Sequence, residues 1–86
     1  MQNTWILGLY IPERSKQANE VQYLLTKFGC SIKTRLGLHD INENECSGNG
    51  IILLELNGDV KEFRKLESEL KKLEGLIVKK MIFKPA

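Results

Sequence analysis

The most regular hydrophobic pattern in the chain lies near its start, in residues 4–11. This segment is rich in residues that favour β-strands and is followed at once by Pro12, so we predict a strand. Alternation assigns its side chains to two faces, with Trp5, Leu7, Leu9 and Ile11 on one and Ile6, Gly8 and Tyr10 on the other. Both faces are largely apolar, which indicates a central strand covered on both sides.

A helix is predicted over residues 15–28, where apolar residues recur at helical spacing. Ser15 is the expected N-cap, and Gly29 suits the left-handed conformation in which many helices end. The apolar stripe of this helix is Ala18, Val21, Leu25 and Phe28.

A second helix is predicted to begin at Asp59, which together with Glu62 is placed like a capping box. Its apolar stripe is Phe63, Leu66, Leu70 and Leu73. Charged residues cover most of its other sides, and Glu67 and Lys71 form a favourable pair four residues apart. We expect Gly75 to end this helix.

Further strands are expected at residues 31–38, 51–56 and 76–83. In the first of these, Ile32, Thr34, Leu36 and Leu38 are expected on one face, with Lys33, Arg35 and Gly37 on the other. Two long cations on one face suit the edge of a sheet. The polar, turn-rich residues 39–50 are expected to form a hairpin loop much longer than the usual length of about 2–5 residues.

The predicted order of elements is therefore βαββαβ. This order is typical of the ferredoxin-like α+β fold, a two-layer sandwich in which two helices cover one face of a four-stranded antiparallel sheet of strand order 4-1-3-2. The other sheet face retains apolar side chains, and such a surface calls for a covering partner. We therefore expect the chain to associate with itself through the sheet, as a homodimer or a tetramer.

Composition limits the remaining possibilities. The 86 residues are expected to form a single domain, residues 1–86. Thirteen basic and eleven acidic residues leave a net charge of +2, so direct nucleic-acid binding is not expected. No apolar run approaches the ~18 residues of a membrane helix. The first four residues lack the basic start of a signal peptide, and two cysteines make no disulfide framework, so we expect a reducing, cytoplasmic location.

Residues suited to catalysis are scarce. His39 is the single histidine, and the seven glycines are scattered rather than gathered in a phosphate-binding loop. Acylphosphatases share the predicted topology, but the glycine-rich sequence of their anion-binding loop is missing before Arg14. The RNA recognition motif requires exposed aromatic residues on its central strands, and residues 51–56 contain none. We expect no enzymatic activity, and the residues indicate no particular cofactor.

A transition-metal site is an alternative. His39 and Cys46 lie in the polar stretch, and imidazole and thiolate groups suit zinc, nickel or copper. Two ligands are too few for a closed site unless association of subunits supplies more, and a lone histidine in a polar loop is more often simply solvated. Cys30 is expected to enter the core as a small apolar group.

A series of short segments between about residues 5 and 83 carries a resemblance to a known family. They are Gly8, Arg14, Ala18, Val21, Leu25, Phe28-Gly29, Arg35-Leu36-Gly37, Gly58, Leu73, Gly75 and Val78-Lys79. In their order and spacing the chain resembles the small regulators associated with the iron-only hydrogenase system. These regulators are related in fold to ACT domains and to the C-terminal domain of the nickel-responsive repressor. The resemblance implies an oligomeric regulatory module without catalysis.

The two related families imply different sites. ACT-like domains bind amino acids at subunit interfaces near the turn after the first strand. The resemblance therefore implies a ligand site at Tyr10, Ile11, Pro12, Glu13 and Arg14, although Pro12 and Glu13 stand where a typical ACT domain has glycine. The nickel repressor uses histidines on the second strand and a cysteine soon after, which His39 and Cys46 resemble, with Gly37 at one histidine position.

The interpretation favoured by these observations is a cytoplasmic regulatory domain that associates with itself. A ligand at the subunit interface would stabilise one assembly or expose a surface to a protein partner. Two alternatives remain: a nickel- or zinc-sensing module that uses His39 and Cys46, and a structural assembly module without a ligand.

Overall fold

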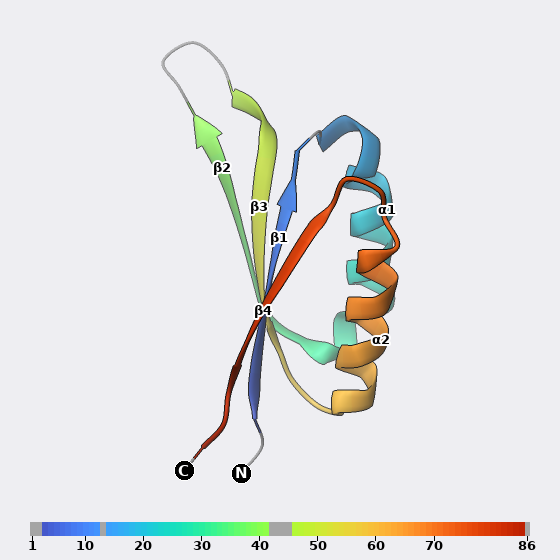
Figure 1. Ribbon diagram of the computed structural model, residues 1–86, viewed down its shortest axis with the longest axis vertical. Coiled ribbons are helices and arrows are strands. Elements are labelled where there is room, and N and C mark those ends of the chain that lie inside the picture. The colour runs from blue at the N-terminus through green and yellow to red at the C-terminus, as the bar shows by residue number, and fades with distance from the viewer. Residues whose placement is uncertain (1–2, 13, 42–45, 86) are drawn as a thin grey trace.

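In the computed structural model, the chain forms a four-stranded antiparallel sheet with two α-helices on one of its faces (Figure 1). The structure describes residues 3–12, 14–41 and 46–85, with the backbone alone for residues 14–16, 38–41 and 46–49. The elements in chain order are β1 (Thr4–Ile11), α1 (Arg14–Lys27), a 3₁₀ turn (Gly29–Ser31), β2 (Ile32–Ile41), β3 (Cys46–Leu56), α2 (Val60–Lys71) and β4 (Ile77–Phe83).

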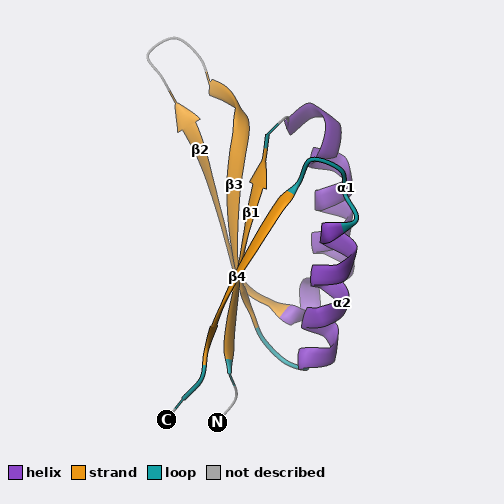
Figure 2. Ribbon diagram, in the orientation of Figure 1, coloured by secondary structure: helices purple, strands orange, loops and turns teal. Residues whose placement is uncertain are grey.

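The strand order confirms the predicted topology. The strands lie in the order β2-β3-β1-β4, and each neighbouring pair is antiparallel. The apolar strands β1 and β3 are central, as their composition predicted, and both helices lie on the same side of the sheet (Figure 2). The chain therefore adopts the ferredoxin-like α+β sandwich.

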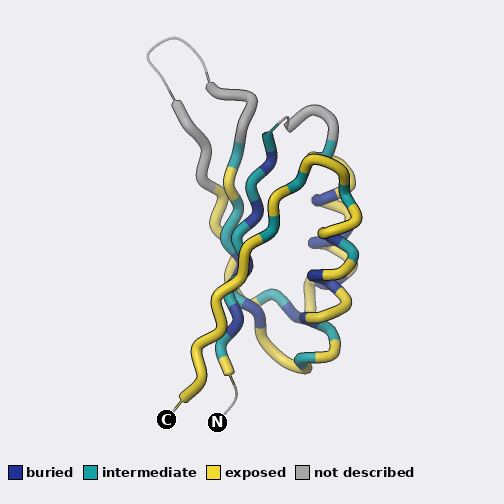
Figure 3. The backbone as a smooth tube through the Cα atoms, viewed as in Figure 1, coloured by how far each residue is buried: buried dark blue, intermediate teal, exposed yellow. Residues whose placement is uncertain are grey.

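The hydrophobic core lies between the sheet and the helices. Every second residue of β1, from Trp5 to Ile11, is buried, which confirms the predicted alternation. The inner sides of both helices are buried as well, whereas β4 is exposed along most of its length (Figure 3). The remaining core residues are Val21, Leu24, Leu25, Phe28, Leu54, Leu56, Phe63, Leu66 and Leu70.

The ends of α2 follow the predicted chemistry in part. The Asp59 carboxylate accepts a hydrogen bond from the backbone N–H of Lys61 at 2.9 Å, as an N-cap should. The Glu62 carboxylate, expected to complete a capping box, forms an ion pair with Lys65 Nζ at 3.1 Å. Gly75 has a φ of 85°, a conformation that other residues rarely adopt, and it leads the chain from α2 into β4.

Two predictions for the end of α1 are wrong. Gly29 has no positive φ; it begins the 3₁₀ turn, in which the N–H of Ser31 donates to the Phe28 carbonyl at 2.9 Å. This turn satisfies the helix end without a left-handed residue. Cys30 lies on the outside of the same turn and is exposed rather than buried in the core.

The predicted alternation of the second strand fails at its start. The register between β2 and β3 shifts between Ile32 and Thr34, which marks a β-bulge. A bulge inserts one residue and reverses the alternation beyond it. Ile32 therefore packs against the core, whereas Thr34 and Leu36 point to the other face, and Arg35 donates a hydrogen bond to Gln22 of α1.

The predicted loop over residues 39–50 is also too long. β2 continues to Ile41 and β3 begins at Cys46, so the two strands form a ribbon that projects beyond the sheet (Figure 1). Two paired strands satisfy each other's backbone hydrogen bonds and do not need an apolar face. The hydrophobic pattern therefore did not predict that these polar residues belong to strands.

Candidate functional site

The face of the sheet away from the helices, which we call the open face, carries side chains from all four strands. Its members alternate with the buried residues that face α1 and α2, and the strand register aligns them. They are Thr4, Ile6, Gly8 and Tyr10 of β1, Thr34 and Leu36 of β2, Ile51, Leu53 and Glu55 of β3, and Ile77, Lys79, Met81 and Phe83 of β4.

Much of the open face is apolar and exposed. Of the seven exposed large hydrophobic side chains in the described part of the chain, five lie here: Leu36, Ile51, Ile77, Met81 and Phe83. Met81 and Phe83 each expose more than half of their surface. Exposed apolar side chains gathered on one face often mark an interaction site.

The register arranges the open face in rows that cross the strands. From β4 through β1 to β3, the rows are Met81, Ile6 and Glu55; Lys79, Gly8 and Leu53; and Ile77, Tyr10 and Ile51. On the far side, β2 extends the first row by Thr34 and the second by Leu36. The middle of the face is therefore formed by the two central strands, with Ile6 and Gly8 of β1 beside Glu55 and Leu53 of β3.

Two charged side chains interrupt the apolar rows. Glu55 is 35% exposed; it accepts a hydrogen bond from Thr34 Oγ1 at 3.1 Å and lies 3.9 Å from Lys33 Nζ. Lys79 lies two strands away, is exposed, and forms no ion pair with the described residues. Gly8 has no side chain and leaves the surface of β1 flat at this point. A Cβ there would lie 3.6 Å from Leu53 Cδ2, which is an ordinary contact distance.

The predicted ligand residues lie at one end of β1. Tyr10 is half-buried on the open face, Ile11 is buried in the core, and Pro12 is half-buried in the bend that follows. Glu13 lies outside the described residues, and Arg14 begins α1 with its side chain outside them. Of the five predicted residues, Tyr10 and Pro12 are therefore the ones with a described, accessible side chain that a ligand at this turn could contact.

The alternative metal ligands lie on paired strands. His39 of β2 pairs with Gly50 of β3, and Ile41 pairs with Cys46. The backbone thus places His39 and Cys46 on neighbouring strands of the projecting ribbon, with their side chains outside the described residues. Elsewhere in the described chain, no three His, Cys, Asp or Glu side chains gather as a metal site.

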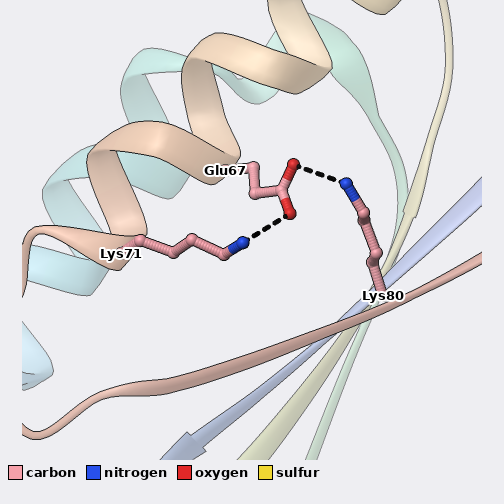
Figure 4. Close-up of polar contacts among 3 residues, drawn as sticks. All are labelled: Glu67, Lys71 and Lys80. Carbon is pink, nitrogen blue, oxygen red and sulfur yellow. Dashed lines mark hydrogen bonds and ion pairs between the residues drawn. The ribbon is translucent and has the colours of Figure 1, made fainter.

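A charged cluster joins α2 to β4 on the helix side of the sheet. The Glu67 carboxylate, about 10% exposed, receives Lys71 Nζ on one oxygen and Lys80 Nζ on the other, each at 3.1 Å (Figure 4). Lys80 Nζ also lies 4.9 Å from the centre of the Trp5 ring, a favourable cation–π distance. The pair of Glu67 and Lys71 was predicted from the sequence, but the contact to β4 was not.

The surroundings of Glu67 determine its protonation. Burial by itself raises the pKa of this carboxyl, but the hydrogen bonds from Lys71 and Lys80, with the attraction of their charges, outweigh burial and hold the pKa below its ordinary value of 4.5. A carboxyl whose pKa is lowered by folding stabilises the fold above its unfolded pKa. That contribution is lost as the pH falls through the folded pKa.

Acid titration of stability tests this cluster. Between pH 6 and about pH 3, we expect the wild-type free energy of unfolding to fall more steeply than that of Glu67→Gln, as measured by urea denaturation at each pH. Lys80→Met removes one of the two cations and should also flatten the profile. Lys61→Met, at an exposed position of α2 away from the cluster, is the matched control and should follow the wild type. Parallel profiles for wild type and Glu67→Gln would contradict the role assigned to Lys71 and Lys80.

The helix layer has an apolar groove of its own. A groove of about 330 Å³ runs between α1 and α2 and is lined by Asn19, Glu20, Tyr23, Leu24, Glu69, Lys72 and Leu73. Tyr23 stands 66% exposed at its edge. This groove lies on the opposite layer from the open face, so the two surfaces are accessible independently.

Comparison with known proteins supports the fold. No family model matches the chain, and no curated protein matches it. Among solved structures, the uncharacterized protein TM1266 from Thermotoga maritima is 27% identical, with a TM-score of 0.80, over 96% of this chain and 100% of that one.

Two further structures are similar in fold at lower identity. The ACT domain of the GTP pyrophosphokinase of Chlorobium tepidum has a TM-score of 0.64 at 15% identity, over 94% of this chain and 89% of that one. CPII from Thiomonas intermedia, a nitrogen regulatory PII-like protein bound to ADP, AMP and bicarbonate, has a TM-score of 0.59 at 12% identity, over 99% of this chain and 97% of that one. The ACT-like fold is thereby confirmed. None of the described helices is long and apolar enough to cross a membrane.

Proposed function

We propose that this chain is a non-catalytic regulatory domain that associates with itself through the open face and responds to a small ligand. The observation that carries the proposal is the open face itself, an apolar sheet surface exposed on an ACT-like fold. A second copy packed against that surface would shield its exposed apolar side chains from water. These side chains are Leu36, Ile51, Ile77, Met81 and Phe83.

The position of Tyr10 links the ligand to the assembly. Its side chain lies on the open face in the row of Ile77 and Ile51, and the chain bends two residues later, at Pro12, before α1 begins at Arg14. A ligand that contacts Tyr10 at this turn would therefore also touch the edge of the subunit interface. Such a ligand would bind the associated and separate forms with different affinities and shift the balance between them.

The similar structures guide the choice of ligands to test. The ACT-like fold makes amino acids the first class, as the sequence resemblance also implies. Nucleotides are the second class, since the PII-like CPII binds ADP and AMP. The resemblance to the regulators of the iron-only hydrogenase system supports the same kind of role, with a protein partner that receives the signal.

A thermal-shift screen against amino acids, nucleotides and divalent metals tests ligand sensing. A ligand present at 100 times its dissociation constant stabilises the folded chain by about 2.7 kcal/mol, which corresponds to a rise in Tm of roughly 10 °C or more for a domain of this size. We expect one member of the amino-acid or nucleotide classes to give such a shift, and Tyr10→Ala to reduce it. Tyr23→Ala, an exposed tyrosine on the helix layer, is the matched control. A chain that responds to none of the compounds is not a sensor for these ligand classes.

Metal sensing is the second candidate. The register that places His39 and Cys46 on paired strands of one ribbon is the observation that favours it. A rise in Tm with nickel or zinc that His39→Ala abolishes would support it. A metal shift that survives both His39→Ala and Cys46→Ser would exclude these two residues as the ligands.

A further inference from the structure

The charges on the open face are arranged in a way that a simple apolar contact surface does not require. Glu55 lies on β3 in the row of Ile6, and Lys79 lies on β4 in the row of Gly8. The two residues therefore stand on opposite sides of β1 and one row apart. Lys79 has no partner among the described residues, although its neighbours on this face are apolar or glycine.

The spacing of a sheet gives this arrangement a symmetry. Neighbouring strands lie about 4.8 Å apart, and alternate residues of one strand lie about 6.8 Å apart. The line that joins the two charged residues thus crosses the central strand β1 midway between Ile6 and Gly8. Consider a two-fold axis that lies in the plane of the interface, passes through this crossing point and runs perpendicular to the line from Glu55 to Lys79. Rotation by 180° about this axis exchanges the positions of the two charged residues.

We propose that a second copy of the chain covers the open face through this two-fold axis. Glu55 of each copy then lies over Lys79 of the other, and the single axis forms both contacts at once, as an isologous interface requires. The inference rests on the self-association proposed above and specifies its geometry.

The same half-turn brings apolar groups together. At the spacings given above, Ile6 of one copy lies over Met81 of the other, and Leu36 lies over Tyr10. An interface in which both charges meet opposite charges and apolar groups meet apolar groups is self-complementary. Rotations that align the charged rows with apolar rows would instead bury Lys79 without a partner and leave Glu55 with Thr34 and Lys33 of its own chain alone.

Gly8 fits the same arrangement. It lies beside the proposed axis, and a glycine within a strand often marks a place where another backbone approaches closely. A Cβ at this position would make only an ordinary contact with Leu53, and the φ of Gly8 is not positive, so the isolated chain does not require glycine here. The close approach of the second copy would explain why glycine occupies this position, which the fold of a single chain does not explain.

Charge reversal tests the arrangement. We expect Lys79→Glu and Glu55→Lys each to raise the dimer dissociation constant about tenfold or more, measured by analytical ultracentrifugation, because each places like charges over one another twice. An equal mixture of the two variants should restore association as a heterodimer detectable by native mass spectrometry, since both contacts again join opposite charges. The double variant should also associate. Lys61→Glu, on the outer side of α2, is the control and should behave as wild type.

The outcomes separate the geometry from the proposed function. A wild-type dimer that neither reversal weakens overturns the two-fold arrangement and leaves self-association standing. Reversals that weaken the dimer without rescue in the mixture also overturn the pairing. A wild-type chain that is monomeric at all concentrations overturns self-association together with it. Gly8→Val supplies a variant without any charge change: it should fold with at least wild-type stability, yet weaken the dimer, and undiminished association would contradict close approach at β1.

Discussion

Phe63→Ala is expected to lower the free energy of unfolding by about 3–5 kcal/mol. Phe63 is 2% exposed and lies in the core, in the first turn of α2, with its ring centre 5.6 Å from that of Trp5. Truncation removes the buried ring and leaves a cavity that the rigid sheet cannot fill. A domain of this length has a total stability of about 4–13 kcal/mol, so this loss is a large fraction of the total.

Urea denaturation followed by the fluorescence of Trp5, the single tryptophan, measures this effect directly. Tyr23→Ala is the matched control, an aromatic-to-alanine change on the other helix at a position that is 66% exposed, and it should alter stability by about 0.5 kcal/mol or less. Similar losses in the two variants would show that Phe63 does not hold the layers together.

Met81→Glu is expected to abolish self-association while leaving the monomer folded. Met81 is 53% exposed in the single chain, so a carboxylate there remains in water and costs the monomer little. Against a second copy, the same carboxylate would be buried beside Ile6 without a cation, which typically costs about 3–5 kcal/mol. The dimer should weaken by about 100-fold or more.

Light scattering coupled to size-exclusion chromatography reports the mass of the two forms. Tyr23→Glu introduces the same charge at an exposed apolar position on the helix layer and should leave the mass as in wild type. If Tyr23→Glu disperses the assembly and Met81→Glu does not, the interface lies on the helix groove rather than on the open face.

Local sequence signals predicted most of the fold correctly. β1 has the predicted bounds, because Pro12 ends a clear alternation. α2 follows Asp59 with Phe63, Leu66 and Leu70 of its predicted stripe buried, whereas Leu73 lies beyond the end of the helix and is partly buried. The errors lie where one local rule competes with another of similar energy. A 3₁₀ turn replaced the left-handed glycine at Gly29, a bulge reversed the alternation after Ile32, and backbone pairing extended the hairpin through polar residues.

The candidate site was predicted only in outline. The alternation of apolar residues and the expected topology together indicated an uncovered apolar face, because both helices lie on the other face of the sheet. The partners of Glu55 depend on how β2 aligns with β3, and the place of Lys79 on the face depends on how β4 aligns with β1. Residues so far apart in sequence carry no signal of either alignment. The ion pair between Glu67 and Lys80 could not be predicted from the sequence for the same reason.

The sequence by itself therefore determined the element order, the central strands and the presence of an uncovered apolar face, since these follow from periodicity within each segment and from the composition of the strands. The tertiary structure alone decided the bulge, the length of the hairpin and the rows of the open face, because those depend on register. Register is set by hydrogen bonds and packing between strands that only the assembled sheet brings together.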